Sequence, residues 1–149
     1  MNNISCILIP PFYLNMSKRN KEKQSEHDQV IHFLEWELFK KGYKVWVNPG
    51  QCKYHESWGL YIDVIAQSYI SNLPRYSVFM EVETDDTVDE NETREWINYE
   101  KAYYFWYLVI PENSKNRALT LLRDHHIENC RLITWKKDTW GRISVSELP

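Results

Sequence analysis

The chain has 149 residues, of which 43% are hydrophobic and 15% aromatic, enough for one buried core but too few to make two ordinary domains the expected organisation. Its 18 basic and 21 acidic residues leave a formal net charge of −3, which excludes a protein that coats nucleic acid through bulk positive charge. With only 4 glycines the sequence has no glycine-rich phosphate loop, which argues against nucleotide-dependent kinases and dehydrogenases. We therefore predict a single domain over residues 1–149.

The N-terminal segment and the cysteines indicate a soluble protein of the cytoplasm. The opening ISCILIPPFYL is apolar, but it lacks a basic start, is interrupted by Pro10 and Pro11, and is too short to span a membrane. Three cysteines, at positions 6, 52 and 130, are odd in number and widely spaced, which disfavours a disulfide framework and favours a reducing compartment. We expect no membrane partner.

Residues 15–29 form a polar run without periodicity, which is either a flexible segment or the frayed start of a helix. A helix is predicted over VIHFLEWELFKKG, because apolar residues recur on one stripe from Val30 to Leu38 and Gly42 follows as a C-cap signal. The stripe predicts that this helix packs on the core.

Three strands are predicted next, over YKVWVNPG, WGLYIDVIAQSYI and RYSVFMEVET. The second contains Asp63 as a lone carboxylate among apolar residues, and the third ends in an acidic cluster. A helix near Glu90–Tyr104 then leads into a strand at Phe105–Ile110. A further amphipathic helix has Ser114 as its cap, and CRLITWK forms a closing strand before a polar tail from Asp138.

This order of elements predicts an α/β fold with a central mixed sheet flanked by helices. The first three strands are expected to form an antiparallel meander, because the connections between them are short. Strand–helix–strand crossovers then add parallel neighbours to the sheet.

The acidic stretch FMEVETDD is divided by the period of the strand. Side chains alternate between the two faces, so Glu81 and Glu83 share a face, and Asp63 on the neighbouring strand can approach Glu81 across the ladder. Converging carboxylates suit a hard cation such as Mg²⁺ or Mn²⁺. The alternative for Asp63 and Glu81 is a buried salt bridge, with Arg75 as a candidate partner. The acids that follow are expected only to open the next helix.

The segments FLEWELFKKGYKV, YIDVIA, FMEVET and ETREWINYEKAYYFWYLVIP together resemble the PD-(D/E)XK nuclease superfamily over roughly residues 30–136. The resemblance implies the restriction-endonuclease-like fold, with an αβββαβ core and an additional C-terminal helix and strand. Asp63 matches the motif Asp and Glu81 the motif Glu. Glu83 stands where the motif has Lys, as in Glu-x-Glu variants of the superfamily.

The activity that the resemblance implies is metal-dependent hydrolysis of phosphodiester bonds in DNA, endonucleolytic rather than exonucleolytic, with RNA as a further possible substrate. Asp63 and Glu81 would hold Mg²⁺ or Mn²⁺, which lowers the pKa of water and stabilises charge on the phosphate, and Glu83 would orient or deprotonate that water. A Glu on the preceding helix assists in the family. The candidate is Glu35, with Glu37 and His32 as alternatives.

Basic side chains are expected to contact DNA phosphates, which position a nucleic acid without reading its sequence. They are Lys40, Lys41, Lys44, Lys53, Arg75, Lys101, Lys136, Lys137 and Arg142. Of these, Lys101 is also the candidate for a displaced motif lysine. Tyr54, Trp58 and Trp140 could stack on exposed bases. Cutting both strands of a duplex would favour a homodimer.

Other interpretations stay open. A catalytically degenerate nucleic-acid-binding or assembly module on the same fold would account for the missing motif lysine. A structural protein of a small genetic element would fit the aromatic-rich chain. Small nucleases of the resembling kind occur in archaeal viruses and mobile elements, and the host cytoplasm would then be the location. A zinc site from Cys52, His55, His126 and Cys130 has compatible spacing within each pair, but the pairs lie far apart.

Overall fold

The computed structural model describes residues 19–50, 53–68 and 77–149. Within these ranges the helices are α1 (Lys21–Lys40), α2 (Thr93–Ala102) and α3 (Lys115–Asp124), with a 3₁₀ turn at Glu112–Ser114 before α3. The strands are β1 (Tyr43–Val47), β2 (Val64–Ser68), β3 (Ser77–Val82), β4 (Trp106–Pro111), β5 (Cys130–Lys137) and β6 (Ile143–Val145). None of these helices is both long enough and apolar enough to cross a membrane.

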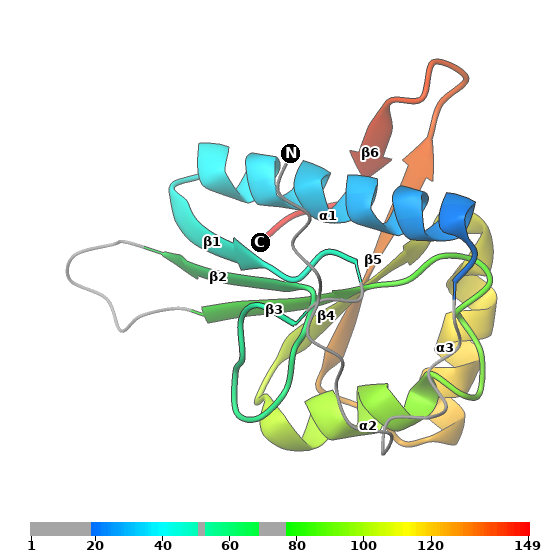
Figure 1. Ribbon diagram of the computed structural model, residues 1–149. Helices are drawn as coiled ribbons and strands as arrows, with labels where there is room; N and C mark the ends of the chain where they lie inside the picture. Colours follow the sequence, from blue (N-terminus) through cyan, green and yellow to red (C-terminus); the bar gives the residue numbers. More distant parts are fainter. Residues whose placement is uncertain (1–18, 51–52, 69–76) are drawn as a thin grey trace.

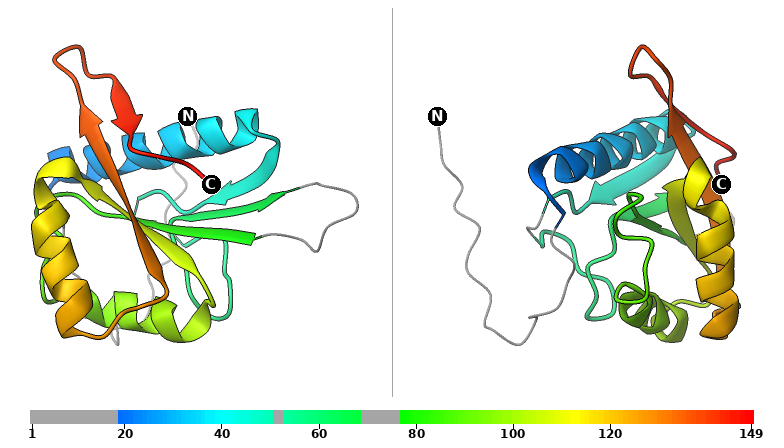
Figure 2. Two further views of the ribbon diagram at one scale, coloured as in Figure 1. Left: turned by 180° about the vertical axis from the view of Figure 1, so that it is seen from behind. Right: turned by 90° about the vertical axis from the view of Figure 1, so that its right-hand side faces the viewer.

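The strands form one mixed sheet in chain order, β1 to β6. β1, β2 and β3 pair antiparallel, β4 and β5 are added in parallel through the crossovers that contain α2 and α3, and β6 returns antiparallel to β5. The predicted α/β fold with a meander followed by parallel neighbours is confirmed. Helix α1 crosses one face of the sheet, and α2 and α3 cover the other (Figures 1 and 2).

The first helix begins earlier than its apolar stripe predicts, at Lys21 rather than at Val30. Asn20 caps it, because its side-chain oxygen accepts the N–H of Lys23 at 2.9 Å. Most of the predicted polar run therefore belongs to the helix, and its residues 15–18 lie outside the described ranges. The predicted end is confirmed, since Gly42 follows the helix with φ +91.

Two further boundaries differ from the sequence expectation, and one predicted cap lacks its side-chain hydrogen bond. The second strand begins at Val64, because Leu60 is bound instead to Ser57 in an isolated bridge. The expected polar tail from Asp138 is wrong, because the chain turns there and returns as β6. Ser114 holds the N-cap position of α3 but makes no side-chain capping hydrogen bond. The Ser57–Leu60 bridge and the three-residue strand β6 are too short to show alternation that could be recognised in a sequence.

Two apolar clusters lie on the two faces of the sheet. The stripe of α1 is fully buried against β2, β3 and β4, and its residues are Val30, Ile31, Leu34 and Leu38. On the other face Trp96, Tyr99 and Trp106 are fully buried among residues of β4 and α3. Burial of each large apolar side chain contributes roughly 1.5–3 kcal/mol. The clusters hold the start of β2 and the end of β3 between the first turns of α1 and α2.

Candidate functional site

Asp63 and Glu81 lie side by side where β2 begins and β3 ends. Val64 pairs with Met80 in antiparallel register, which sets Asp63 opposite Glu81 at the next pair. The N–H of Asp63 donates to Glu81 Oε2 at 3.3 Å, and the N–H of Val82 donates to Asp63 Oδ2 at 2.8 Å. Each of the two acidic residues is only 7% exposed. The expected approach of Asp63 to Glu81 across the ladder is observed.

His27 of α1 holds Asp63 in position. Its Nε2 lies 3.1 Å from Asp63 Oδ2 and its Nδ1 3.0 Å from Asp28 Oδ1, which also accepts the N–H of Gly50. Burial lowers the pKa of His27, but the charge of Asp63 and the hydrogen bonds with Asp28 and Asp63 outweigh it and raise the pKa to about 9. At neutral pH His27 is therefore protonated and donates to both carboxylates.

Glu83 is a buried anchor for the segment after β3. Its Oε1 accepts Trp96 Nε1–H at 3.0 Å, and its Oε2 accepts Arg19 Nη2–H at 2.8 Å and the hydroxyl of Thr87. Burial raises the pKa of Glu83 to about 7, although the charge of Arg19 opposes the rise. Both carboxylate oxygens are engaged and the residue is 1% exposed, so Glu83 fixes this segment to Arg19 and α2.

Arg19, the residue before the N-cap of α1, places a positive charge among these acids. Its guanidinium is held by acceptors of residues 82–87, which are Val82 O, Glu83 Oε2, Thr84 Oγ1 and Thr87 Oγ1, at 2.8–3.3 Å. Burial lowers the pKa of Arg19, but its acidic neighbours, which include Asp63 and Glu81, raise it above its ordinary value. Nη1 donates to none of the described residues.

Two glutamates at the start of α2 complete the acidic centre, the name used below for Asp63, Glu81, Glu83, Glu92 and Glu95. Burial and then the charges of Glu83 and Glu95 raise the pKa of Glu92 to about 8. Burial also raises the pKa of Glu95, whose Oε1 accepts the hydroxyl of Tyr99 at 2.8 Å. For Glu81, burial and then the charges of Asp63, Glu95 and Glu83 raise the pKa well above its usual range. Like charges crowded in this way favour a bound cation.

Sequence reasoning missed Arg19, His27, Glu92 and Glu95. Acids at a helix start have a sufficient explanation in the helix dipole, so α2 gave no signal. The sequence does contain a signal for His27, because this residue lies three positions before Val30 and continues the buried stripe of α1 toward the N-terminus. A histidine on an apolar stripe needs a buried partner, and here the partner is Asp63.

The predicted helical glutamate, Glu35, does not join the acidic centre. Its Oε2 lies 2.9 Å from His32 Nδ1 on the partly exposed side of α1. It stands eight residues after His27, about 12 Å further along the helix axis. Glu37, the alternative, pairs with Lys40 at 2.6 Å. The helix contributes a histidine to this centre rather than a glutamate.

The basic residues expected to bind DNA do not converge on the acidic centre. Lys40 and Lys41 end α1, about 20 Å beyond His27 along its axis. Lys136 pairs with Glu112 at 3.7 Å, and Lys137 donates to Gln29 of α1 at 2.9 Å. Arg142 lies at the turn of the β5–β6 hairpin, which projects from the body of the protein (Figure 1). Lys44 lies over the ring of Trp46 at 4.9 Å, and Lys101 is exposed in the last turn of α2. Arg75 lies outside the described residues.

Lys53 is the exception among them, because its positive charge acts on Glu95 of the acidic centre. Its Nζ lies 5.0 Å from the ring of Tyr61. It follows the gap at residues 51–52 and precedes Tyr54.

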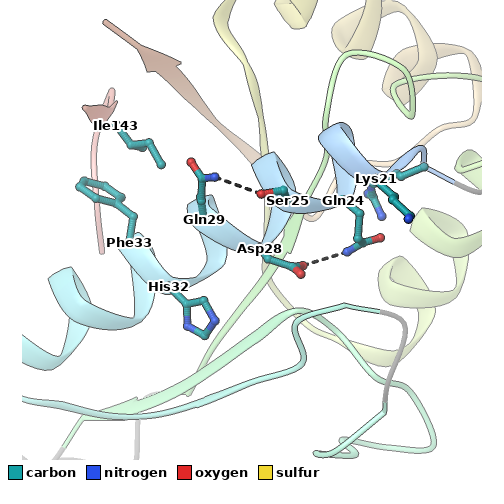
Figure 3. Close-up of a pocket in the computed structure, with 9 residues that line it drawn as sticks. Lys21, Gln24, Ser25, Asp28, Gln29, His32, Phe33 and Ile143 are labelled. Carbon is teal, nitrogen blue, oxygen red and sulfur yellow. Dashed lines mark hydrogen bonds between the residues drawn. The ribbon is translucent and has the colours of Figure 1, made fainter. Parts of the chain in front are cut away.

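A groove of about 790 Å³ runs along α1, and Figure 3 shows the side chains that line it. Gln24 donates to Asp28 at 2.8 Å at one end, and Phe33 lies with Ile143 at the other. Arg19 both lines this groove and contacts Glu83. The groove thus approaches the acidic centre from the side of α1.

The donor set of the acidic centre suits a hard divalent cation. Within the described ranges, no group of three or more His, Cys, Asp or Glu side chains is already arranged around a common metal position. Mg²⁺ is usually held by one or two carboxylates together with waters and substrate phosphates, so a pair is enough. Asp63 Oδ1 and Glu81 Oε1 accept no hydrogen bond from the described residues. The two acids therefore fit Mg²⁺ or Mn²⁺.

The zinc alternative gains no support. Cys52 lies outside the described residues, and His55, His126 and Cys130 form no ligand group in the described part of the chain. Burial raises the pKa of the Cys130 thiol, which opposes formation of the thiolate that zinc requires.

The acidic centre predicts a protein that loses stability as the pH rises. Glu83 and Glu92 have pKa values of about 7 and about 8 against an ordinary value of 4.5. Their contribution to stability is therefore complete below pH 4.5 and lost as the pH rises through 7 and 8, and His27 acts in the same direction toward pH 9. We expect a melting temperature lower by about 5 °C or more at pH 8.5 than at pH 5.5, measured by circular dichroism.

Glu92→Gln should flatten this pH dependence, because the uncharged amide cannot be repelled by Glu83 and Glu95. A melting temperature that rises between pH 5.5 and 8.5 would contradict the electrostatic description. Asp28, whose pKa is lowered, affects stability only as the pH falls below its ordinary value of 3.8.

The centre gathers buried carboxylates that repel one another, and the positive charges of Arg19 and Lys53 act on members of it. The charged side chains of this site come from four segments of the chain, which are the start of α1, the residue before β2, the end of β3 and the start of α2. Comparison with protein-family models, with curated proteins and with solved structures finds no match to this chain.

Proposed function

We propose that the protein is a divalent-metal-dependent nuclease that hydrolyses phosphodiester bonds in DNA, with Asp63 and Glu81 as the metal ligands. The observation that carries this proposal is that two buried acids lie opposite each other at the adjoining ends of β2 and β3, with the N–H of Asp63 donating to Glu81 Oε2 at 3.3 Å. The observed order of helices and strands is compatible with the αβββαβ core that the sequence resemblance to the PD-(D/E)XK nucleases implies. Two acids held this close repel one another, and a bound cation removes that cost.

The residues of the chain would act as holders of the cation and of the phosphate. When bound, Mg²⁺ or Mn²⁺ would supply Lewis acidity toward a phosphoryl oxygen and lower the pKa of water. His27 and the N–H of Val82 hold Oδ2 of Asp63, which leaves Oδ1 for the cation. Glu81 is held through Oε2 and offers Oε1.

Arg19 would take the part that the motif lysine plays in the resembling family. Glu83 stands at that motif position, and its buried carboxylate binds Arg19 at 2.8 Å. A guanidinium stays charged at every relevant pH and suits phosphate oxygens. Glu83 is thus a positioning residue for Arg19, and the role proposed for it from the sequence, orientation of water, is not needed.

A non-catalytic nucleic-acid-binding or assembly module is the second candidate. The observation that favours it is that Arg19 and His27 already offset part of the negative charge of the acidic centre. Such a module would bind DNA in a salt-dependent manner and leave it uncut, and its binding would survive loss of both Asp63 and Glu81.

The test is incubation of the purified protein with linear and supercoiled DNA in the presence of Mg²⁺ or Mn²⁺, with EDTA as the control. We expect cleavage that requires the metal. Intact DNA under all metal conditions, together with binding that weakens as salt is added, would overturn the nuclease proposal in favour of the module.

A further inference from the structure

A second groove, of about 410 Å³, opens on the sheet face that carries Glu81. We call it the aromatic groove, and its lining includes Trp46, Tyr54, Trp58, Ile65, Gln67 and Phe79. Trp46, Ile65 and Phe79 are cross-strand neighbours that form its floor. Phe79 precedes Glu81 by two residues on β3, so the two side chains share a face with their Cα atoms about 7 Å apart. The groove therefore adjoins the acidic centre.

The wall of the aromatic groove is a fixed loop. Asn48 ties it down, because its side chain donates to His55 O and Ile62 O at 2.8 Å and accepts the N–H groups of Tyr54 and His55. Tyr103 donates from its hydroxyl to Ser57 O at 3.1 Å. The loop thus holds its exposed side chains in defined positions without help from a ligand.

Trp58 lies on this loop with an exposed side chain and an unusual backbone conformation. It is 82% exposed and has φ +54, and the next residue, Gly59, has φ +78. Ser57 and Leu60 close the turn with hydrogen bonds at 2.8 and 3.0 Å. Turns with two positive φ values normally carry Asn-Gly or Asp-Gly, and a bulky side chain there is strained. Strain of this kind persists where a function requires it.

We propose that the aromatic groove binds unpaired bases of a DNA strand whose backbone continues past Lys53 to the acidic centre. Trp58 and Tyr54, which is 56% exposed, offer ring faces on which any base can stack. Gln67 and His55 on the lining offer polar groups to base edges. This inference rests on the proposed nuclease function and deepens it, because it names the substrate as DNA with a single-stranded stretch rather than an intact duplex.

The experiment measures binding without cleavage. A fluorescently labelled single-stranded DNA oligomer and a blunt duplex of the same sequence are titrated with protein in EDTA, and fluorescence anisotropy is recorded. We expect Trp58→Ala to weaken binding of the single strand about tenfold, because stacking on one aromatic side chain is lost, and to change binding of the duplex less than about twofold. Trp58→Phe, which keeps a ring face, should restore most of the affinity.

Trp36→Ala is the matched control, because Trp36 is 59% exposed and lies on α1, which crosses the other face of the sheet, away from the groove (Figure 1). Its affinity for both oligomers should equal that of the parent. The proposal is overturned if Trp58→Ala binds the single strand as tightly as the parent, or if it weakens single strand and duplex equally. If the protein cleaves DNA but Trp58→Ala shows no selective loss of single-strand binding, only the proposed role of the aromatic groove is contradicted. If the selective loss is observed but the parent protein cleaves no DNA, only the proposed nuclease function is contradicted.

Discussion

Glu81→Gln is expected to lower the rate of metal-dependent DNA cleavage at least about 10²-fold, while the protein remains folded and gains stability. Glutamine keeps the shape of the side chain but loses the negative charge that would hold a cation. The same loss of charge removes the cost of burying a carboxylate and the repulsion from Asp63 and Glu95, which together raise the pKa of Glu81. Activity and stability should therefore move in opposite directions, as they do where charge is crowded for function. Cleavage rates and melting temperatures of the same preparations measure both.

Glu35→Gln is the matched control for this prediction. It makes the same chemical change on α1, but Glu35 contacts His32 and lies about 12 Å along the helix from His27. Its cleavage rate should stay within about twofold of the parent. The proposed role of the acidic centre in cleavage would be contradicted if Glu81→Gln and Glu35→Gln lowered the cleavage rate equally. It would also be contradicted if Glu81→Gln cleaved DNA as fast as the parent.

Arg19→Ala is expected to lower the free energy of unfolding by about 3–5 kcal/mol at pH 8, measured by denaturant titration. The substitution leaves Glu83, which is 1% exposed, without its cation partner at 2.8 Å. At pH 5 the loss should be smaller, because a protonated Glu83 needs no counter-charge. Glu83→Gln in the Arg19→Ala background should recover part of the loss, which separates electrostatics from lost packing.

Lys23→Ala gives the scale for an ordinary ion pair. Lys23 contacts Asp85 at 2.9 Å with both side chains partly exposed, so its loss should cost at most about 1 kcal/mol. If Arg19→Ala costs no more than Lys23→Ala, Arg19 is not the buried counter-charge described above.

The sheet could be predicted because its signals are local. Apolar runs mark β1, β2 and β3, and the helices between β3, β4 and β5 imply parallel crossovers. Asp63 and Glu81 could be named because a carboxylate inside an apolar run is costly unless something binds it. Their mutual contact followed from the strand period alone.

The partners of these acids could not be predicted because they come from distant parts of the chain. Arg19 meets Glu83 across 64 positions of sequence, and His27 meets Asp63 across 36. Both stand in the polar run, where a charged residue is normally solvated. The sequence places Glu83 at a motif position but does not indicate its partner, so the contact with Arg19 could be recognised only in the structure.

The decisive measurement is the cleavage rate of one supercoiled plasmid as Mg²⁺ is titrated, for the parent protein and for Asp63→Asn. If Asp63 and Glu81 hold the cation, the parent rate should rise with Mg²⁺ and saturate. Asp63→Asn, which keeps its size but loses its charge, should cut at least about 10²-fold more slowly at every concentration. A parent that leaves the plasmid intact, or an Asp63→Asn variant with the same rate and metal dependence as the parent, would contradict a metal-dependent nuclease at this centre.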